Sequence, residues 1–129
     1  NRFIIVANVK PSKKILIAED EKPLAHAMEL KLSNAGYVVT VANDGDQAIQ
    51  YLKNNKYDLL LLDLIMPVSD GFNVLQNMKI SKNKTPVIVM SNLSQEEDKI
   101  KTTNFGVKDF FIKSDTSLAE LILKIQTYI

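Results

Sequence analysis

The sequence predicts an α/β fold in which five strands, each followed by a helix, form one doubly wound parallel sheet. From Lys13 onward, short runs rich in β-branched residues or Leu alternate with segments of helical period, a pattern typical of βα units. Residues 58–62 are apolar after the first position, as expected of a central strand covered on both faces. The chain has 129 residues, 46% of them apolar, enough for one ordinary core. We therefore expect a single domain over residues 13–129.

The first two βα units are marked by residues that begin and end helices. The first strand is expected at residues 14–18, and its helix has Pro23 near the first turn and Gly36 after the last. The second strand is expected at residues 37–42, with Asn43 as the N-cap of a short helix. Apolar spacing predicts the buried faces of the two helices: Leu24, Ala27, Met28 and Leu32, then Ala48, Ile49 and Leu52.

The third unit contains the most apolar strand, at residues 58–62. A loop at residues 67–71 follows it, and Asp70 is the expected cap of the next helix. The fourth strand is expected at residues 87–90, directly after Pro86. The apolar residues that indicate the third helix are Phe72, Val74, Leu75, Met78 and Ile80.

The remaining helices have recognisable start and stop residues. Ser94 and Glu97 have capping-box spacing for the fourth helix, and Gly106 is expected to end it. The fifth strand is expected at residues 109–112. The last helix is predicted from a second capping box and one apolar face: Ser117 with Glu120, then Leu118, Ile122, Ile125 and Ile129.

Charge and residue content exclude several kinds of function. Lys and Arg outnumber Asp and Glu by only 16 to 15, which gives no reason to expect a nucleic-acid or acidic-membrane partner. The chain has no Cys and one His, so disulfides and thiolate metal sites are excluded. No apolar run approaches the roughly 20 residues needed to span a membrane. We therefore expect a cytoplasmic protein.

Four of the five predicted strands are followed by polar side chains. Glu19 and Asp20 follow the first strand, and Asp63, Ser91 and Lys113 follow the third, fourth and fifth. Each residue alone has an ordinary structural explanation, but the carboxyl ends of parallel strands meet at one edge, where ligands bind in this class of fold. Carboxylates suit Mg²⁺, an Asp can act as nucleophile toward a phosphoryl group, and a Lys can stabilise the transferring oxygens. The sequence therefore predicts a phosphoryl-transfer site.

Four segments in this order resemble the receiver domain of bacterial two-component response regulators. They are ILIAEDE at residues 15–21, DLLLLDLIMPVSDGF at 58–72, PVIVMS at 86–91 and DFFIK at 109–113. The pattern of Asp, two residues, Met-Pro and then Gly is the most specific. The resemblance covers residues 13–129 and implies a flavodoxin-like sheet with strand order 2-1-3-4-5.

The resemblance also implies a role for each polar residue. Asp63 would be the phosphoacceptor of a signalling switch that, with Mg²⁺, catalyses its own phosphorylation and dephosphorylation. The other roles are the Mg²⁺ site (Glu19, Asp20, Asp63 and the backbone carbonyl of Ile65), the phosphoryl contacts (Ser91 and Lys113) and the switch (Ser91 and Phe110).

The implied partners are other signalling proteins. The phosphoryl group would come from a sensor histidine kinase or a phosphotransfer protein. Output to a downstream protein or effector domain would pass through the fourth helix, the fifth strand and the fifth helix. We also expect a homodimer on phosphorylation, and no direct nucleic-acid or membrane partner.

Three residues depart from the family pattern. Phe110 stands where many members have Tyr, so its ring makes no hydroxyl hydrogen bond. Asn92 stands where a small residue is common, and Ser114 follows Lys113 where the family usually has Pro. A cis bond before a residue other than Pro costs about 2.5 to 4 kcal/mol, so we predict a trans Lys113–Ser114 bond and an altered loop over residues 113–117.

Other hypotheses remain beside the signalling switch. A nucleotide-cofactor domain of flavodoxin or Rossmann type needs a Gly-rich or hydroxyl-rich phosphate loop after the first strand, where residues 19–21 are acidic and would repel phosphate. A receiver-like interaction module that no longer takes phosphate is the main alternative, and a metal-dependent phosphohydrolase is more distant. Residues 1–12 have no counterpart in the family, and we expect an N-terminal extension, either tag-derived or an extra edge strand.

Overall fold

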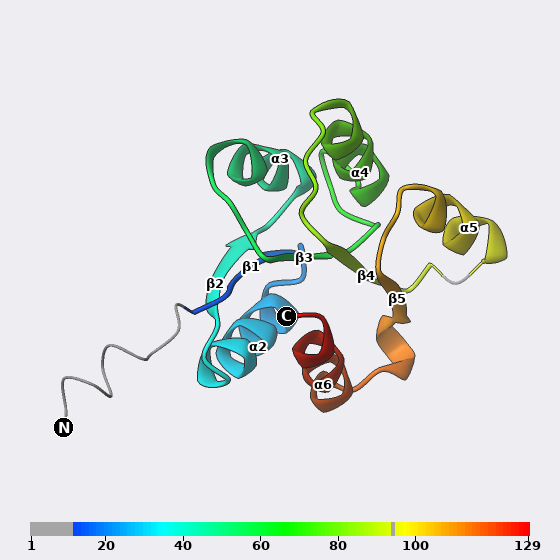
Figure 1. Cartoon of the computed structure of the whole chain (residues 1–129). Coiled ribbons are helices and arrows are strands. Elements are labelled where there is room, and N and C mark those ends of the chain that lie inside the picture. Colours follow the sequence, from blue (N-terminus) through cyan, green and yellow to red (C-terminus); the bar gives the residue numbers. More distant parts are fainter. Residues whose placement is uncertain (1–11, 94) are drawn as a thin grey trace, which may run out of the picture.

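The structure is a computed structural model that describes residues 12–93 and 95–129. Its five parallel strands form one sheet in the order β2-β1-β3-β4-β5 (Figure 1). The predicted fold class and strand order are therefore confirmed. The extension predicted at residues 1–12 lies outside the described residues, apart from Ser12. The strands are β1 (Lys14–Ala18), β2 (Val38–Ala42), β3 (Leu59–Leu62), β4 (Val87–Ser91) and β5 (Asp109–Ile112).

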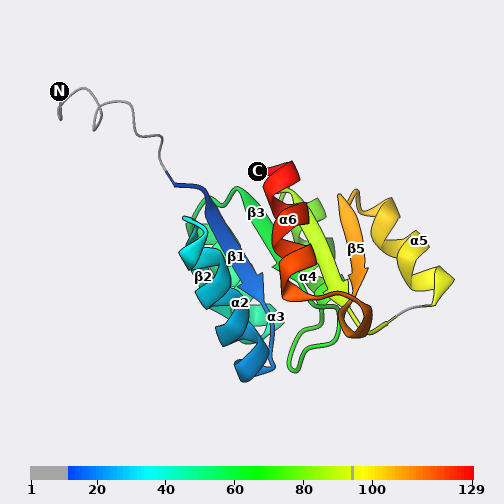
Figure 2. The same ribbon diagram turned by 90° about the horizontal axis from the view of Figure 1, so that it is seen from below.

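Helices cover both faces of the sheet. One face carries α2 and α6, and the other carries α3, α4 and α5 (Figures 1 and 2). None of the helices in the described part of the chain has the length and apolar content to cross a membrane. The helices are α2 (Lys22–Asn34), α3 (Gly45–Asn54), α4 (Gly71–Ile80), α5 (Glu96–Asn104) and α6 (Leu118–Tyr128), with a 3₁₀ turn η1 (Lys113–Asp115) before α6.

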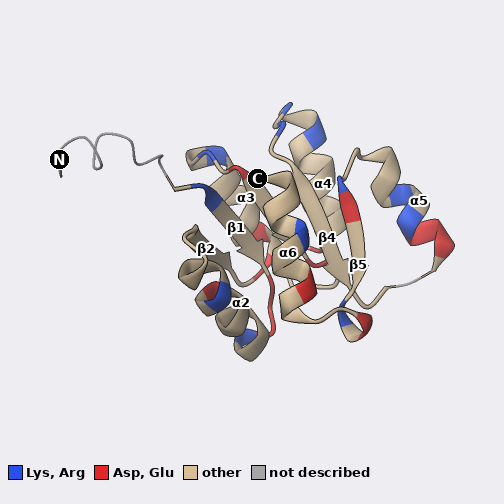
Figure 3. Ribbon diagram, turned by 60° about the horizontal axis from the view of Figure 1, so that its bottom comes forward, with Lys and Arg blue, Asp and Glu red and all other residues tan. Residues whose placement is uncertain are grey.

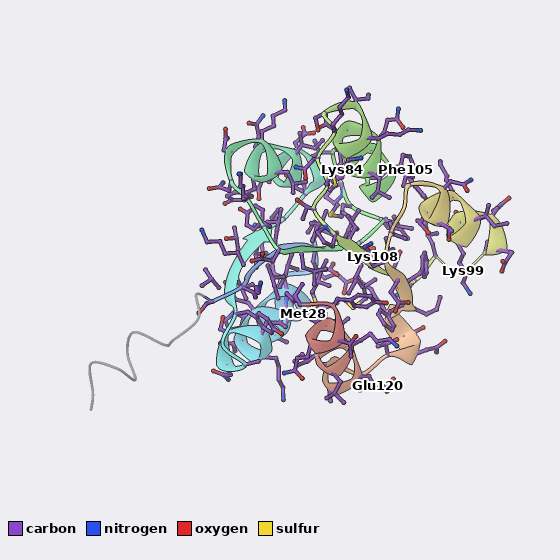
Figure 4. The ribbon with its side chains drawn as sticks, in the orientation of Figure 1. Met28, Lys84, Lys99, Phe105, Lys108 and Glu120 are labelled. Atoms are coloured by element: carbon purple, nitrogen blue, oxygen red, sulfur yellow. The ribbon has the colours of Figure 1, made fainter. Side chains whose placement is uncertain are left out.

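The central strand β3 is apolar on both faces because each face is covered by helices. Leu60 and Leu62 pack in the layer formed with α3 and α4, whereas Leu59 and Leu61 pack in the layer formed with α2 and α6. Met28 of α2 belongs to the second layer and points toward the sheet (Figure 4). The two layers hold β3 rigidly, so the residue that follows it has a fixed position.

Strand ends differ from the prediction by single residues. Tyr37 was expected to begin the second strand, but its N–H donates to the Leu32 carbonyl at 3.1 Å and so completes the end of α2. Asp58 was expected to begin the third strand, but its carboxylate binds the Lys14 N–H at 2.7 Å, just before the ladder starts. Ser91 extends β4 by one residue because it pairs with Ile112 in β5.

Two helix caps also differ from the prediction. The N-cap of α3 is Asp44 rather than Asn43, because the Asp44 carboxylate accepts the Gln47 N–H at 2.8 Å. The N-cap of α5 is Gln95, without a side-chain hydrogen bond, and not Ser94, which lies outside the described residues. The caps predicted at Asp70 and Ser117 are confirmed, since each accepts the N–H three residues later.

Candidate functional site

The ends of β1 and β3 bring three carboxylates together. The Asp63 N–H donates to the Ala18 carbonyl at 3.0 Å, so the two segments leave the sheet side by side. Carboxylate oxygens of Glu19, Asp20 and Asp63 all lie within 4.8 Å of one another, and we call these residues the carboxylate cluster. In Figure 3 the acidic residues that follow β1 and β3 lie at one edge of the sheet, opposite the Lys residues at the far ends of α3 and α4.

Lys113 is the cation of this site. It follows β5, and its Nζ lies 2.8 Å from Asp63 Oδ2, 2.6 Å from Glu19 Oε1 and 3.5 Å from Glu21 Oε1. Burial would lower the pKa of the ammonium, but the hydrogen bond to Asp63, the contact with Glu19 and their charges outweigh burial and raise the pKa. Lys113 is therefore held in its charged form against the carboxylate cluster.

Glu19 is a buried carboxylate whose negative charge is only partly stabilised by neighbouring groups. Its Oε2 accepts the Glu21 N–H at 3.1 Å. Its Oε1 touches Lys113 Nζ as an ion pair but has no aligned hydrogen-bond partner among the described residues. Burial raises the pKa of the Glu19 carboxyl, and Lys113 and the Glu21 N–H offset only part of this rise. A buried oxygen with spare coordination beside two other carboxylates suits a hard divalent cation such as Mg²⁺.

The orientation of Asp63 is fixed from both sides. Its Oδ1 accepts the Ile65 N–H at 3.1 Å, and its Oδ2 accepts from Lys113. Gly71 lies at the start of α4, where any side chain would be excluded because a Cβ would collide with the backbone carbonyl of Asp63. The Gly of the predicted pattern is thus required by the approach of α4 to the Asp63 backbone. The role predicted for the Ile65 carbonyl in metal binding stays a prediction.

Two predicted switch residues lie near the site without contacting Asp63 through a hydrogen bond. Ser91 is fully buried at the end of β4, and its Oγ accepts the Leu93 N–H at 3.3 Å within its own loop. Phe110 is partly buried in β5 and packs against the layer formed with α3 and α4. Their role in the switch therefore stays a prediction.

The peptide bond that begins the loop after β5 has the predicted geometry, whereas the predicted difference of this loop from the family stays a prediction. The Lys113–Ser114 bond is trans, since the described residues contain no cis peptide bond. The segment forms the 3₁₀ turn η1, and the Ser114 N–H donates to Asn92 Oδ1 at 3.0 Å. Asn92 and Ser114 were expected only as separate departures from the family, and the contact between them was not predicted. The available signal was their matching position, since each comes one residue after a predicted phosphoryl-contacting residue, Ser91 or Lys113.

A second contact that the sequence did not reveal supports the loop after β3. Gly45, the first residue of α3, lies so close to Ser69 that a Cβ would collide with the Ser69 carbonyl. The Asp-Gly pair after the second strand is the available signal, because Gly permits such close approach of two backbones. Gly45 therefore helps to hold the segment between Asp63 and Gly71.

Comparisons with known proteins agree with this arrangement. The family model described as the response regulator receiver domain matches residues 15–126. The chain belongs to this family. Receiver domains of two-component response regulators act in signal transduction, and the family resemblance inferred from the sequence is confirmed.

Individual relatives show how much of a response regulator this chain represents. It is 35% identical over 114 residues to the transcriptional regulatory protein DltR of Streptococcus agalactiae, covering 86% of this chain and 51% of the relative. It is 34% identical over 100 residues to the cell cycle response regulator CtrA of Brucella ovis, covering 78% of this chain and 43% of the relative. The chain therefore spans about half the length of the curated relatives it matches.

Solved structures show the same fold. The Francisella response regulator 1452 receiver domain superposes with a TM-score of 0.85 at 33% identity, covering 91% of this chain and 96% of the other. The Thermotoga maritima response regulator TrrA, solved in complex with Mg²⁺-BeF, superposes with a TM-score of 0.79 at 23% identity, covering 91% and 99%. Receiver domains bind Mg²⁺ at an acidic pocket, and this chain has an acidic cluster at its strand ends.

Proposed function

We propose that this receiver domain is a phosphorylation-dependent switch in which Asp63 accepts a phosphoryl group from the phosphohistidine of a partner kinase or phosphotransfer protein. The observation that supports this most is the environment of Asp63. Its carboxylate lies at the end of the central strand, oriented by the Ile65 N–H and by Lys113, and next to Glu19 and Asp20. Glu19 is also buried and also contacts Lys113, so what distinguishes Asp63 is its position directly after the central strand β3.

The proposed chemistry uses groups of this chain directly. A carboxylate oxygen of Asp63 attacks the phosphorus, the P–N bond of phosphohistidine breaks, and the imidazole leaves with the electron pair and takes up a proton. Lys113 moves with a short change of its side chain from the Asp63 carboxylate to an oxygen of the new acyl phosphate. Ser91 supplies a further hydrogen-bond donor once its hydroxyl turns away from the Leu93 N–H.

Mg²⁺ is the cofactor that fits the donor set. Asp20 and Asp63 would hold it, with the Ile65 carbonyl and with Glu19 as a neighbouring carboxylate. When bound, the ion supplies charge neutralisation for the phosphoryl oxygens. Two observations support this assignment: Glu19 Oε1 contacts Lys113 but has no aligned hydrogen bond among the described residues, and three carboxylates lie together.

Output is proposed to pass through α5, β5 and α6. Ser91 leads into the loop before α5, and Lys113 joins β5 to α6, so both phosphoryl-contacting residues are connected to this surface. Thr102 is the single buried residue of α5, a helix with few apolar anchors. Such a helix can shift at low energetic cost. An effector domain, a separate protein or a second copy of the phosphorylated chain would bind there.

Phosphorylation is tested by intact-mass analysis after incubation with acetyl phosphate. The wild type should gain one phosphoryl group in the presence of Mg²⁺ and none after chelation. Asp63→Asn should gain none. Asp44→Asn is the matched control, because it alters an acidic residue at the same edge that caps α3 and lies outside the carboxylate cluster.

The result separates the switch from the alternative of an interaction module. A wild-type protein that folds and binds Mg²⁺ but gains no phosphoryl group would leave the interaction module as the better hypothesis. A phosphoryl group retained by Asp63→Asn would show that the acceptor lies elsewhere.

A further inference from the structure

One hydrogen bond joins the two loops that follow Ser91 and Lys113. The Ser114 N–H donates to Asn92 Oδ1 at 3.0 Å, across 22 positions of sequence. Asn92 is the residue directly after Ser91, and Ser114 is the residue directly after Lys113. The bond therefore connects the backbone beside one phosphoryl-contacting residue to the backbone beside the other.

The local structure after β5 shows why this bond matters for Lys113. The turn η1 begins at Lys113, and its first N–H groups have no partner within the turn. The preceding residue, Ile112, provides no side-chain cap, and the bond that closes the turn, from the Thr116 N–H to the Lys113 carbonyl, is long at 3.5 Å. Asn92 thus supplies from another loop the capping acceptor that the turn lacks locally.

The Ser114 N–H and the Lys113 carbonyl share one peptide plane, so fixing that N–H fixes the backbone from which the Lys113 side chain departs. That side chain must reach Asp63 and Glu19 at 2.8 Å and 2.6 Å. We propose that Asn92 is a positioning residue for Lys113, and that it couples the loop of Ser91 to the loop of Lys113. The proposal rests on the proposed function in that Lys113 is taken to contact the phosphoryl group.

Three substitutions separate the two ends of the bond. Asn92→Ala removes the acceptor. Ser114→Pro removes the donor, because Pro has no N–H. Ser114→Ala keeps the backbone N–H and is the matched control for loss of the hydroxyl alone. Asn92→Ala combined with Ser114→Pro completes a double-mutant cycle.

The first measurement is binding of beryllofluoride, a phosphoryl mimic, at saturating Mg²⁺, beside binding of Mg²⁺ alone. Both residues are exposed, which places the hydrogen bond at the weaker end of its usual range. We expect beryllofluoride affinity to fall about two- to fivefold in Asn92→Ala and in Ser114→Pro, and to be unchanged in Ser114→Ala. The double variant should bind no more weakly than the weaker single variant. Mg²⁺ affinity should be unchanged throughout, because the carboxylate cluster does not contact Asn92.

The second measurement is the NMR signal of the Lys113 side chain in the absence of Mg²⁺. Its shift should move toward that of exposed lysines in Asn92→Ala and Ser114→Pro, and stay at the wild-type position in Ser114→Ala. Equal losses of Mg²⁺ and beryllofluoride affinity, additive effects in the double variant, or an unmoved Lys113 signal would each overturn the proposal. A wild-type protein that binds no beryllofluoride would count against the proposed function, while the Lys113 signal would still test the role of Asn92.

Discussion

Replacing Lys113 by Met is expected to destabilise the protein, because it removes the cation that contacts two buried carboxylates. The Lys113 side chain is 9% exposed, and those of Glu19 and Asp63 are 1% and 5% exposed. Among the described residues, no other Lys forms an ion pair with either carboxylate. Met keeps a flexible unbranched stem, so the substitution removes the charge with little change in packing.

The magnitude follows from the distances at the site. Without the ammonium, Glu19 and Asp63 carry like charges within 4.8 Å, a repulsion of about 3.5 kcal/mol at an effective dielectric constant of about 20. Each carboxylate keeps one backbone N–H, and protonation of Glu19 relieves part of the repulsion. We expect the free energy of unfolding to fall by about 3 kcal/mol, close to the usual cost of breaking a buried ion pair. The whole free energy of unfolding of a typical domain is only about 5 to 15 kcal/mol.

Urea unfolding at neutral pH without Mg²⁺ measures this loss. The midpoint of Lys113→Met should fall by roughly 2 M relative to the wild type if the slope is about 1.5 kcal/mol per M. Lys84→Met is the matched control, since Lys84 is exposed in a loop at the opposite edge of the sheet (Figure 4). Its stability should lie within about 0.5 kcal/mol of the wild type.

Acid and Mg²⁺ should each reduce the deficit of Lys113→Met. Loss of the ammonium raises the pKa of Glu19 further above its ordinary value, so the folded variant binds a proton more tightly than the unfolded chain. The variant therefore keeps its stability below the ordinary glutamate pKa and loses it as the pH rises through the raised value. Mg²⁺ replaces the missing positive charge. Equal urea midpoints for Lys113→Met and Lys84→Met at neutral pH would refute this reasoning. So would a loss of stability in Lys113→Met that neither acid nor Mg²⁺ reduces.

Three further substitutions test particular features. Val68→Gly should raise the free energy of unfolding by about 1 kcal/mol, because Val68 is 79% exposed and has a φ of 68° that β-branched residues avoid. The control Val38→Gly in β2 should lower the free energy of unfolding, and equal changes of both variants in urea unfolding would contradict the prediction. Gly71→Ala should lower Mg²⁺ affinity through its collision with the Asp63 backbone, whereas Gly106→Ala, which has open space at φ 84°, should leave Mg²⁺ affinity unchanged by calorimetry. Glu19→Gln without Mg²⁺ should gain stability relative to the wild type as the pH rises above the ordinary glutamate pKa, since burial raises the pKa of Glu19; a constant difference across pH would show that burial of its charge is not costly.

The strands and the residues that follow them were predictable because both depend on local patterns. An apolar run such as that of β3 identifies a strand covered on both faces, and a parallel sheet places the next residue at a common edge. Glu19, Asp20, Asp63 and Lys113 meet at that edge as expected. The errors at strand starts arose from single hydrogen bonds, such as that from the Tyr37 N–H to α2, which an apolar pattern does not encode.

Contacts between loops were not predictable in the same way. The direction of the Ser91 hydroxyl depends on the conformation of the following turn, where the Leu93 N–H competes for it. The bond between Asn92 and Ser114 joins two loops whose relative position follows from the pairing of β4 with β5. The collision that excludes a side chain at Gly45 likewise depends on how α3 meets a distant loop. Each requires the assembled sheet before the contact can be recognised.

The net charge of the site determines what phosphorylation can change. Three carboxylates and one ammonium leave a formal charge of −2, which a divalent cation would cancel. Conversion of the Asp63 carboxylate into an acyl phosphate would replace one negative charge by up to about two, so a Mg²⁺-loaded site would become negative. Lys113 already contacts Glu19 and Asp63, so the Ser91 hydroxyl at the neighbouring strand end would be a further donor for the added charge. The excess charge would therefore favour movement of the Ser91 hydroxyl toward Asp63, and Asn92 is the next residue, bonded to the loop after β5.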